Sequence, residues 1–596
     1  MSYTIVVTEY FKNLIITILK VEVSRVSEKV LKASNGNHNL SDYEKTYENF
    51  DWEESKKAFS WNETGKVNAA YEAIDRHAEN PDKKDQVALH FTSPDRTEDV
   101  TFDQLKRSSN QFANVLKKQG IEKGDRVFMF MPRSPEFYAS FFGVLKVGAI
   151  AGPLFEAFME QAVRDRLEDS EAVMLITTPE LLERVPQDEL LDLKKIVLVG
   201  DSKDIDDGYI DFYKEMDQAS EDFDIEWVDL EDGMLIHYTS GSTGKPKGVY
   251  HVHNAMIQHY QTGKWVLDLK EGDVYWCTAD PGWVTGTSYG IFAPWLNGVT
   301  NVIVGGRFTP DAWYGALDQY NVTVWYSAPT AFRKLMSAGA DVPKKHDLSS
   351  LRHILSVGEP LNPEVVHWGM KAFDLRIHDT WWMTETGAML ICNFPTMDIR
   401  PGSMGKPIPG IEAAIVDDEG NELPPNQMGN LAIKRGWPSM MRAIWKRPQK
   451  FESYFVNGWY VSGDSAYQDE DGYFWFQGRL DDVINTSGER VGPFEVESKL
   501  IEHEAVSEAG VIGKPDPERG EIIKAFIALN EGYEDSDDLR EEIRQFVKKG
   551  FAAHAAPREI EVTESIPKTR SGKIMRRLLK SRELGLPEGD TSTLEE

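Results

Sequence analysis

The sequence predicts an α/β protein of two domains, a large one of layered sheets and helices followed by a small α+β one. Between residues 71 and 228, helical stretches such as 105–119 alternate with apolar runs such as 126–131 and 172–177. This alternation is typical of strands covered by helices in an α/β layer structure. The chain of 596 residues, 41% of them hydrophobic, is long enough to form more than one core.

The composition changes near residue 480, where a charge-rich segment of roughly a hundred residues begins, a common size for a small domain. Short strands such as 525–529 are expected there. Residues 1–22 are apolar in part but interrupted by Glu9 and Lys12, so they are too polar to span a membrane. We expect a flexible N-terminal extension at 1–22, a large domain at 23–480 and a small domain at 481–596.

The charge and the cysteines narrow the class of protein. The formal net charge of −31 argues against a surface for nucleic acid or for an anionic membrane. The two cysteines, Cys277 and Cys392, are too few for a disulfide framework, and their spacing fits no metal motif. We therefore predict a cytoplasmic protein without nucleic-acid or membrane partners.

The clearest chemical motif is the stretch 238–248, which is rich in glycine, hydroxyl and lysine residues and follows the apolar run 234–236. Glycines let backbone N–H groups converge, hydroxyls add donors and lysines add positive charge, so the stretch is suited to phosphate. It is not a Walker A motif, because Pro246 follows Lys245 where that motif needs Ser or Thr. The expected phosphate ligands are Thr239, Ser240, Gly241, Ser242, Thr243, Gly244, Lys245 and Lys247.

A flexible Ser/Gly linker is the alternative interpretation of this stretch. We consider it weaker because the stretch lies between an expected strand and a helical pattern at 254–267, for which Asn254 is the expected N-cap.

The run TSGSTGKPKG resembles the signature of the acyl-adenylate-forming superfamily, which includes acyl-CoA synthetases, luciferases and the adenylation domains of peptide synthetases. The resemblance extends from about residue 43 to the end of the chain. It implies an adenylate-forming large domain and a mobile small domain, with a loop that closes over the β- and γ-phosphates of ATP.

Three further segments, 283–286, 357–360 and 379–385, could each be ordinary packing or turn residues. Together and in this order they resemble the AMP-forming acetyl-CoA synthetases. That resemblance implies an acetate pocket closed at its far end by an indole and lined by Val284, Thr285, Val357 and Trp382.

The same resemblance implies the nucleotide ligands. Thr384 is expected at the α-phosphate and Glu385 at Mg²⁺, for which a carboxylate is a suitable hard ligand. Asp464 is expected at both ribose hydroxyls, with Arg479 as a further donor. The other expected ligands of adenine, ribose or phosphate are Gly358, Glu359, Pro360, Asp379, Thr380, Trp381 and Arg490.

The small domain carries the remaining expected sites. The run PKTRSGK makes Lys573 the expected adenylation lysine, although a basic stretch is usually just solvated. Asp481 falls at the hinge position of the family. CoA is expected at Ser487, Gly488 and Lys548, the last standing where some relatives have an arginine. A second Mg²⁺ is expected at His503 and the carbonyls of Ile501 and Val506.

His251 and His253 could be offered as a further metal pair, but no third ligand follows with a suitable spacing, so we expect them to be packing residues.

These residues predict an acetate–CoA ligase that uses ATP, CoA and Mg²⁺ and passes through acetyl-AMP. A propionyl- or medium-chain acyl-CoA synthetase is the alternative, although a small residue is expected at position 382 in the medium-chain enzymes. An adenylation module for a carrier protein or an inactive nucleotide-binding regulator fits less well, because no carrier segment follows and both Glu385 and Lys573 are present. Acetylation would remove the charge of Lys573, and in relatives it is a switch, so a lysine acetyltransferase and a deacetylase are expected partners.

Overall fold

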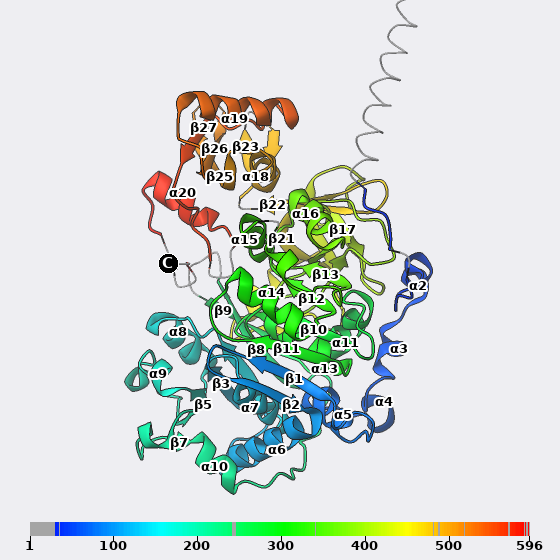
Figure 1. The fold of residues 1–596 in the computed structure, drawn as a ribbon, viewed down its shortest axis with the longest axis vertical. Helices are drawn as coiled ribbons and strands as arrows, with labels where there is room; N and C mark the ends of the chain where they lie inside the picture. The colour runs from blue at the N-terminus through cyan, green and yellow to red at the C-terminus, as the bar shows by residue number, and fades with distance from the viewer. Residues whose placement is uncertain are drawn as a thin grey trace, which may run out of the picture.

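The computed structural model describes residues 30–34, 36–240, 246–339, 341–480, 482–486, 489–517, 519–569, 573–588, 591 and 594. Within them the chain forms four sheets, two of them large and mixed, and the helices that cover them. Figure 1 shows the C-terminal elements gathered at one end of the molecule, set apart from the larger body that holds the other three sheets.

The nine-stranded sheet has the order β16-β15-β14-β13-β12-β10-β11-β1-β2. Its central strands are parallel, and β2, β15 and β16 run antiparallel to their neighbours. The strands are β1 (Val87–Thr92), β2 (Thr97–Thr101), β10 (Val274–Cys277), β11 (Thr300–Val304), β12 (Val324–Ser327), β13 (His353–Ser356), β14 (Ile377–Trp381), β15 (Ile391–Cys392) and β16 (Lys406–Pro407).

The eight-stranded sheet has the order β19-β9-β8-β4-β3-β5-β6-β7. Its strands are β3 (Arg126–Phe130), β4 (Ile150–Leu154), β5 (Met174–Thr177), β6 (Lys195–Leu198), β7 (Ile210–Asp211), β8 (Gly233–Ser240), β9 (Pro246–Val252) and β19 (Ala443–Ile444).

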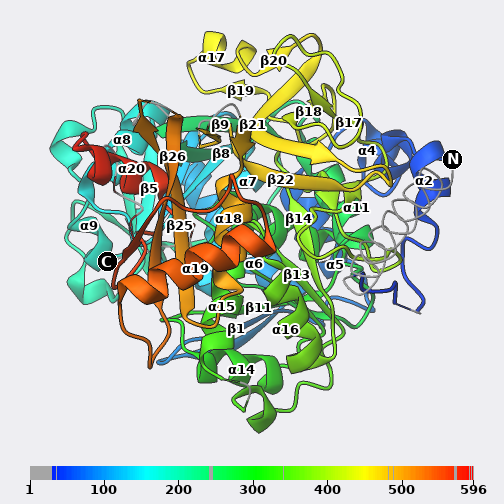
Figure 2. The same ribbon diagram turned by 90° about the horizontal axis from the view of Figure 1, so that it is seen from above.

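Two five-stranded sheets complete the fold. One contains β17 (Ala413–Val416), β18 (Gly429–Lys434), β20 (Phe455–Val456), β21 (Trp459–Gln468) and β22 (Phe474–Arg479). The C-terminal one contains β23 (Ile484–Thr486), β24 (Glu489–Val491), β25 (Val506–Asp516), β26 (Gly520–Leu529) and β27 (Glu559–Val562). Figure 2 shows α19 lying across the C-terminal sheet.

The described α-helices are α2 (Tyr43–Asn49), α3 (Trp52–Lys56), α4 (Trp61–Thr64), α5 (Arg76–Ala78), α6 (Phe102–Lys118), α7 (Pro135–Lys146), α8 (Glu160–Ser170), α9 (Pro179–Leu182), α10 (Phe212–Gln218), α11 (Ala255–Trp265), α12 (Val284–Thr287), α13 (Ala293–Leu296), α14 (Pro310–Gln319), α15 (Pro329–Ser337), α16 (Pro363–Phe373), α17 (Pro448–Glu452), α18 (Pro493–Ile501), α19 (Asp537–Gly550) and α20 (Arg576–Leu584). Two π-helical turns, η1 (Tyr71–Asp75) and η4 (Ser288–Phe292), and three 3-10 turns, η2 (Gln187–Glu189), η3 (Ser202–Asp204) and η5 (Pro343–Lys345), lie between them.

The largest core cluster joins the two large sheets through the helices between them. It includes Leu89 of β1, Val127 of β3, Phe112 of α6, Phe141 of α7 and Trp295 of α13, all buried. Burying apolar side chains of both sheets against shared helices fixes the sheets relative to each other, so the loops at their ends hold a defined geometry.

The predicted α/β class with a small α+β C-terminal unit is confirmed. The expected helix at 105–119 corresponds to α6, whose capping box at Thr101 and Gln104 makes it begin three residues earlier. The apolar runs at 126–131 and 172–177 correspond to β3 and β5, and 525–529 lies inside β26.

Around the phosphate motif, one local prediction is wrong and another holds only for its position. The motif joins β8 to β9 in an antiparallel hairpin, so a second strand stands between it and α11. Asn254 does stand at the N-cap position of α11, but its backbone is helical, and its side chain makes no capping hydrogen bond and donates to Glu231 at 3.1 Å instead.

Candidate active site

The stretch of expected phosphate ligands begins in β8 and ends in β9, and these two strands pair antiparallel up to Ser240 and Pro246. Gly241, Ser242, Thr243, Gly244 and Lys245 lie outside the described residues, as does the side chain of Ser240. Thr239 Oγ1 is buried and has no hydrogen-bond partner among the described residues. A buried hydroxyl of this kind can donate to a ligand at low cost, because no existing bond must break.

Lys247, at the start of β9, reaches the loop after β14. Its Nζ lies 2.7 Å from Oε1 of Glu385, and both side chains are largely buried. Tyr454 closes the group, since its hydroxyl bonds Lys247 Nζ and lies 3.5 Å from Glu385 Oε1. Although burial opposes ionisation, the charge of Lys247 lowers the pKa of Glu385 below its usual value, so the carboxylate is ionised.

The carboxyl ends of β10, β12, β13 and β14 meet at one edge of the nine-stranded sheet, which is where open α/β sheets bind ligands. The segment after β13 supplies Val357, Gly358, Glu359 and Pro360, and Gly358 has a φ of +92°, which only glycine adopts without strain. The segment after β14 supplies Trp382, Thr384 and Glu385, and the backbone carbonyl of Thr384 is bonded to His251 Nε2 at 2.8 Å.

Trp382, in the segment after β14, contacts aromatic residues of other elements. Its Nε1 donates to the Tyr326 hydroxyl at 3.1 Å, and its ring meets Tyr289 edge-on at 5.0 Å. The Tyr326 hydroxyl is also bonded to Thr380 Oγ1 at 2.7 Å. Val284 begins α12, with Thr285 next to it, and Val284, Val357 and Trp382 belong to one core cluster. The indole is therefore fixed in one orientation by a polar and an aromatic contact.

Two further carboxylates are held by arginines. Glu359 Oε2 accepts from Arg333 at 2.7 Å and from Thr330 at 2.9 Å, while its Oε1 is buried without a partner among the described residues. Asp464 Oδ1 accepts from Arg479 at 2.8 Å, and its Oδ2 accepts from Trp381 Nε1 at 2.9 Å. Both carboxylates are oriented by their partners, as groups that bind polar hydroxyls or amines must be.

Asp379, in β14, differs from these carboxylates. Desolvation raises its pKa well above the usual value, more than the backbone N–H groups of Thr380 and Leu361 lower it. Its Oδ1 is buried and unpartnered among the described residues. A carboxyl in such surroundings is more stable in the protonated form.

Lys573, before α20, comes from the C-terminal part of the chain to this edge. The residue as a whole is exposed, yet the pKa of its amine is lowered, first by desolvation and then by the positive charge of Arg479. The negative charge of Asp464 opposes this shift, so the amine of Lys573 interacts electrostatically with both members of the Asp464–Arg479 pair. Asn362, near Glu359, donates to Ser498 of α18 at 2.9 Å and ties the two parts together.

Comparison with known proteins places this site in a family. Residues 74–445 match the model of AMP-binding enzymes, and residues 495–573 match the model of the AMP-binding enzyme C-terminal domain. The chain is 69% identical to an acetyl-coenzyme A synthetase of Bacillus subtilis over 570 residues, which are 95% of this chain and 100% of that protein. The chain belongs to the AMP-binding enzymes, among the acetyl-coenzyme A synthetases.

More distant members of the AMP-binding family agree. An acetyl-coenzyme A synthetase of Rubrobacter xylanophilus is 43% identical over 89% of this chain and 87% of that protein. A crystal structure of an anthranilate CoA ligase in complex with anthranoyl-AMP superposes with a TM-score of 0.80, at 33% identity over 87% of this chain and 98% of that chain. An acyl-CoA synthetase of Brucella canis gives a TM-score of 0.73, at 35% identity over 92% of this chain and 99% of that chain.

The remaining predicted ligands of the AMP-binding chain are placed less fully. Asp481, Ser487 and Gly488 lie outside the described residues, as does the side chain of Arg490. Lys548 is exposed in the last turn of α19. The expected second Mg²⁺ site holds His503, which is buried, accepts from Ala505 N at 3.2 Å through Nδ1 and packs edge-on against Phe546. No three described His, Cys, Asp or Glu side chains form a group able to hold a metal ion.

The residues for which we expected packing roles are buried in this family member. His251 and His253 are buried and bonded to backbone groups, through Nε2 to Thr384 O and through Nδ1 to Ala69 N. Cys277 and Cys392 are buried free thiols. In the part of the chain that the structure describes, no helix is long and apolar enough to cross a membrane.

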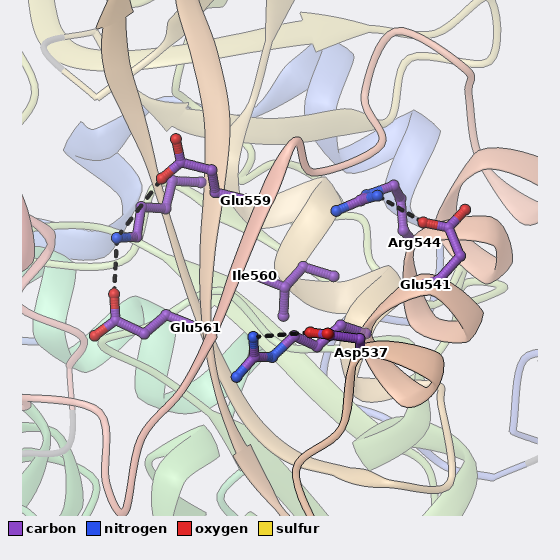
Figure 3. A pocket seen from close by; sticks show the side chains of 8 residues that line it. Asp537, Glu541, Arg544, Glu559, Ile560 and Glu561 are labelled. Carbon is purple, nitrogen blue, oxygen red and sulfur yellow. Dashed lines mark hydrogen bonds and ion pairs between the residues drawn. The ribbon is translucent and has the colours of Figure 1, made fainter.

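An open groove in the C-terminal domain of this AMP-binding enzyme is separate from the site. It lies between α19 and β27 and is lined by charged side chains such as Lys524, Arg544, Glu541 and Glu561 (Figure 3). Lys524 binds Glu561 at 2.7 Å and Arg544 binds Glu541 at 2.6 Å, so these charges already satisfy one another. The groove offers no comparable set of side chains free to take ATP.

Sequence reasoning missed the residues that support the site. Tyr326 and Tyr289 contact Trp382, and Tyr454 contacts Lys247. Arg333 and Thr330 donate hydrogen bonds to Glu359. None lies in a motif of small or charged residues, so a single sequence carries no local signal for them.

Proposed function

We propose that this protein is an AMP-forming acetate–CoA ligase, which joins acetate, ATP and CoA to give acetyl-CoA, AMP and diphosphate. The observation that carries the reaction is the 69% identity with an acetyl-coenzyme A synthetase over nearly the whole of both chains. The fixed indole of Trp382 supports acetate as the acid, because a rigid ring at the end of the pocket leaves room for little more than a methyl group.

In the first half-reaction an acetate oxygen attacks the α-phosphorus of ATP and the bond to the diphosphate breaks. Both partners are anions, so cations must neutralise them as charge builds up on the transferred phosphoryl group. We assign this work to Lys573 and to the loop lysines Lys245 and Lys247, with Thr384 at the α-phosphate. Asp464 and Arg479 hold the ribose, and Gly358, Glu359 and Pro360 border the adenine, with Asp379, Thr380, Trp381 and Arg490 as further nucleotide ligands.

Glu385 is the proposed ligand of Mg²⁺. The carboxylate is ionised and already holds a cation, the ammonium of Lys247 at 2.7 Å, which supports its fitness for a hard divalent ion. When bound, Mg²⁺ would supply positive charge to the phosphate oxygens. The second Mg²⁺ at Ile501, His503 and Val506 remains a prediction from the resemblance.

In the second half-reaction the CoA sulfur attacks the carbonyl carbon of acetyl-AMP, the bond to the phosphate oxygen breaks, and AMP leaves. One carbonyl cannot face both Lys573 and the CoA tunnel, so we propose that the domain beginning at 481 rotates about Asp481 between the steps. Ser487 and Gly488 would then line the tunnel, and Lys548 would meet the CoA nucleotide as a point charge.

The location and the regulatory partners are also proposals. Two buried free thiols are consistent with a reducing cytoplasm. A lysine acetyltransferase that removes the charge of Lys573, and a deacetylase that restores it, would switch adenylation off and on. Protein acetylated at Lys573 that kept full adenylation activity would contradict this switch.

The first experiment measures diphosphate release by purified protein with ATP and Mg²⁺ across acetate, propionate, butyrate and octanoate, with and without CoA. We expect acetate to be preferred, with propionate a weak second because one methylene changes binding by only about 1–3 kcal/mol. CoA should drive turnover with formation of AMP. Preference for octanoate would favour a medium-chain synthetase, and indifference to CoA would point to another acceptor.

The second experiment separates the half-reactions. Lys573→Ala should lose adenylation yet convert supplied acetyl-AMP and CoA to acetyl-CoA, because only the first step needs its charge. Lys580→Ala is the matched control, since Lys580 lies nearby in α20 and pairs with Glu521 at 3.3 Å. Equal loss of both steps in Lys573→Ala would count against the domain rotation.

A further inference from the structure

Lys247, Glu385 and Tyr454 form a closed triangle of side chains. Lys247 Nζ lies 2.7 Å from Glu385 Oε1, the same amine bonds the Tyr454 hydroxyl, and that hydroxyl lies 3.5 Å from the same carboxylate oxygen. One oxygen therefore receives both a lysine and a tyrosine. The Lys247 side chain is 14% exposed and that of Glu385 is 7% exposed, so water competes little with these contacts.

Tyr454 holds the lysine by its ring as well as by its hydroxyl. Lys247 Nζ lies 4.9 Å from the centre of the ring, and Lys450 Nζ lies 5.2 Å from it. The ring itself is stacked on Tyr460 at 5.7 Å with an interplanar angle of 18°, which fixes its position. Tyr454 lies in the short segment between α17 and β20, which is far along the chain from both β9 and Glu385.

The triangle conflicts with the two roles proposed for its charged members. Glu385 is the proposed Mg²⁺ ligand, and Lys247 is a proposed ligand of the ATP phosphates. Mg²⁺ binds its oxygens at about 2.0–2.1 Å, and an ammonium held on the same oxygen would be repelled by it. The lysine and the metal therefore cannot both occupy Glu385 Oε1.

We propose that Tyr454 is a positioning residue that holds Lys247 on Glu385 in the nucleotide-free enzyme, so that this lysine and the divalent cation compete for the carboxylate. Arrival of the cation with ATP releases Lys247 from Glu385 towards the phosphates. The inference rests on the proposed function for the destination of the lysine, but the competition itself concerns only the free protein.

This arrangement has a physical advantage. A buried carboxylate without a partner is costly, and Lys247 provides the partner before the metal arrives. The same contact discourages a metal ion from settling at Glu385 without ATP. The enzyme then needs no empty, charged metal site in its free state.

The test is the affinity of the nucleotide-free full chain for Mn²⁺, used as a spectroscopic probe of the Mg²⁺ site and measured by electron paramagnetic resonance. Lys247→Met should bind Mn²⁺ about tenfold more tightly than the parent, because a charge-assisted hydrogen bond no longer has to be broken. Tyr454→Phe keeps the ring and loses only the hydroxyl, so a gain of about threefold is expected.

Tyr467→Phe is the matched control, since Tyr467 is also half-buried and stacks on an aromatic ring, that of Trp475 at 6.0 Å. Its Mn²⁺ affinity should equal that of the parent. Adding Glu385→Gln to Lys247→Met should abolish the gain, which assigns the gain to this carboxylate. A tyrosine or lysine that merely stabilised the fold would weaken metal binding when removed, so a gain separates positioning from a structural role.

The proposal is overturned if Tyr454→Phe, folded as judged by circular dichroism, binds Mn²⁺ no more tightly than the parent. It is also overturned if the tightened binding of Lys247→Met persists when Glu385→Gln is added. If Lys247→Met does not fold, Tyr454→Phe alone decides. Acetate, ATP and CoA are absent from this measurement, so its failure is distinct from failure of acetate-dependent diphosphate release, which tests the proposed function.

Discussion

Replacing Trp382 by glycine should convert the enzyme from acetate to longer acids. The indole is only 8% exposed and is fixed by the Tyr326 hydroxyl at 3.1 Å and by the Tyr289 ring at 5.0 Å. Its removal opens the proposed far end of the acetate pocket, while Val284, Thr285 and Val357 remain. The side of the pocket that would hold the carboxylate is therefore retained and the methyl end becomes deeper.

The size of the change follows from the apolar surface that a longer acid can bury. Each additional buried methylene is worth about 0.8 kcal/mol, and pentanoate has three more than acetate. The ratio of kcat/KM for pentanoate to that for acetate should therefore rise by about 50-fold, since 1.4 kcal/mol is a factor of ten. Truncating a buried tryptophan also lowers the free energy of unfolding by about 3–5 kcal/mol.

The assay is diphosphate release at saturating ATP and CoA, with kcat/KM determined for acetate, propionate, butyrate and pentanoate. Trp382→Phe is the conservative control and should keep the preference for acetate, because a ring still closes the pocket. Trp475→Gly controls for general destabilisation and should leave the ratio unchanged. A folded Trp382→Gly protein with the parent's ratio of pentanoate to acetate would refute the assignment of Trp382 to the pocket.

Two further predictions concern the nucleotide and pH. Asp464→Asn should raise the KM for ATP about tenfold or more, because a charge-assisted acceptor for the ribose hydroxyls is lost. Asp471, which is exposed and also paired with an arginine, is the control, and Asp471→Asn should leave the KM for ATP unchanged. An unchanged KM in both variants would contradict the ribose assignment. Burial lowers the pKa of His77, His237 and His259 to about 3. Histidine in an unfolded chain has a pKa near 6.5, so the unfolded state binds more protons than the folded state below about pH 6.5. The free energy of unfolding should thus fall as pH drops from about 6.5 towards 3, by about 1.4 kcal/mol per pH unit for each histidine. A thermal unfolding midpoint that stays constant from pH 7 to pH 5 would contradict this prediction.

The sequence predicted the fold class well because its signals are local. The apolar runs that became β3 and β5 and the amphipathic pattern that became α6 each depend on neighbouring residues. The hairpin of β8 and β9 was missed because its strands are joined by a glycine- and lysine-rich loop that hides the second strand. The sequence located Asn254 at the N-cap of α11 but did not show that its side chain makes no capping hydrogen bond, because the bond it makes instead, to Glu231, depends on a turn 23 residues earlier in the chain.

Of the site, the sequence predicted the residues that lie in compact motifs but not those that orient them. Trp382, Glu385 and Asp464 could be proposed from short runs, whereas their partners come from distant segments. Tyr326 is 56 residues from Trp382, and Tyr454 is 69 residues from Glu385. Such pairs are set by the packing of separate elements, which no pattern within one segment encodes.

Three ion pairs lie at the free site, and they bear on how an acidic protein binds ATP. Three of the site's described cations are each held by a carboxylate: Lys247 by Glu385, Arg333 by Glu359 and Arg479 by Asp464. In a chain with a net charge of −31, the negative potential of the protein attracts cations to a buried edge, but removing them from water is costly. Pairing each cation with a carboxylate offsets that cost.

Binding of ATP at these positions must therefore rearrange the existing ion pairs. Of the three pairs, only the Lys247–Glu385 pair joins a proposed phosphate ligand to a proposed metal ligand, so Mg²⁺ and ATP arriving together can take both partners at once. Neither alone replaces both halves of the pair. A site built in this way favours Mg·ATP over free ATP, and it predicts that the Mg²⁺ concentration needed for adenylation should be lower in Tyr454→Phe than in the parent enzyme, whereas the preference for acetate should be unaffected.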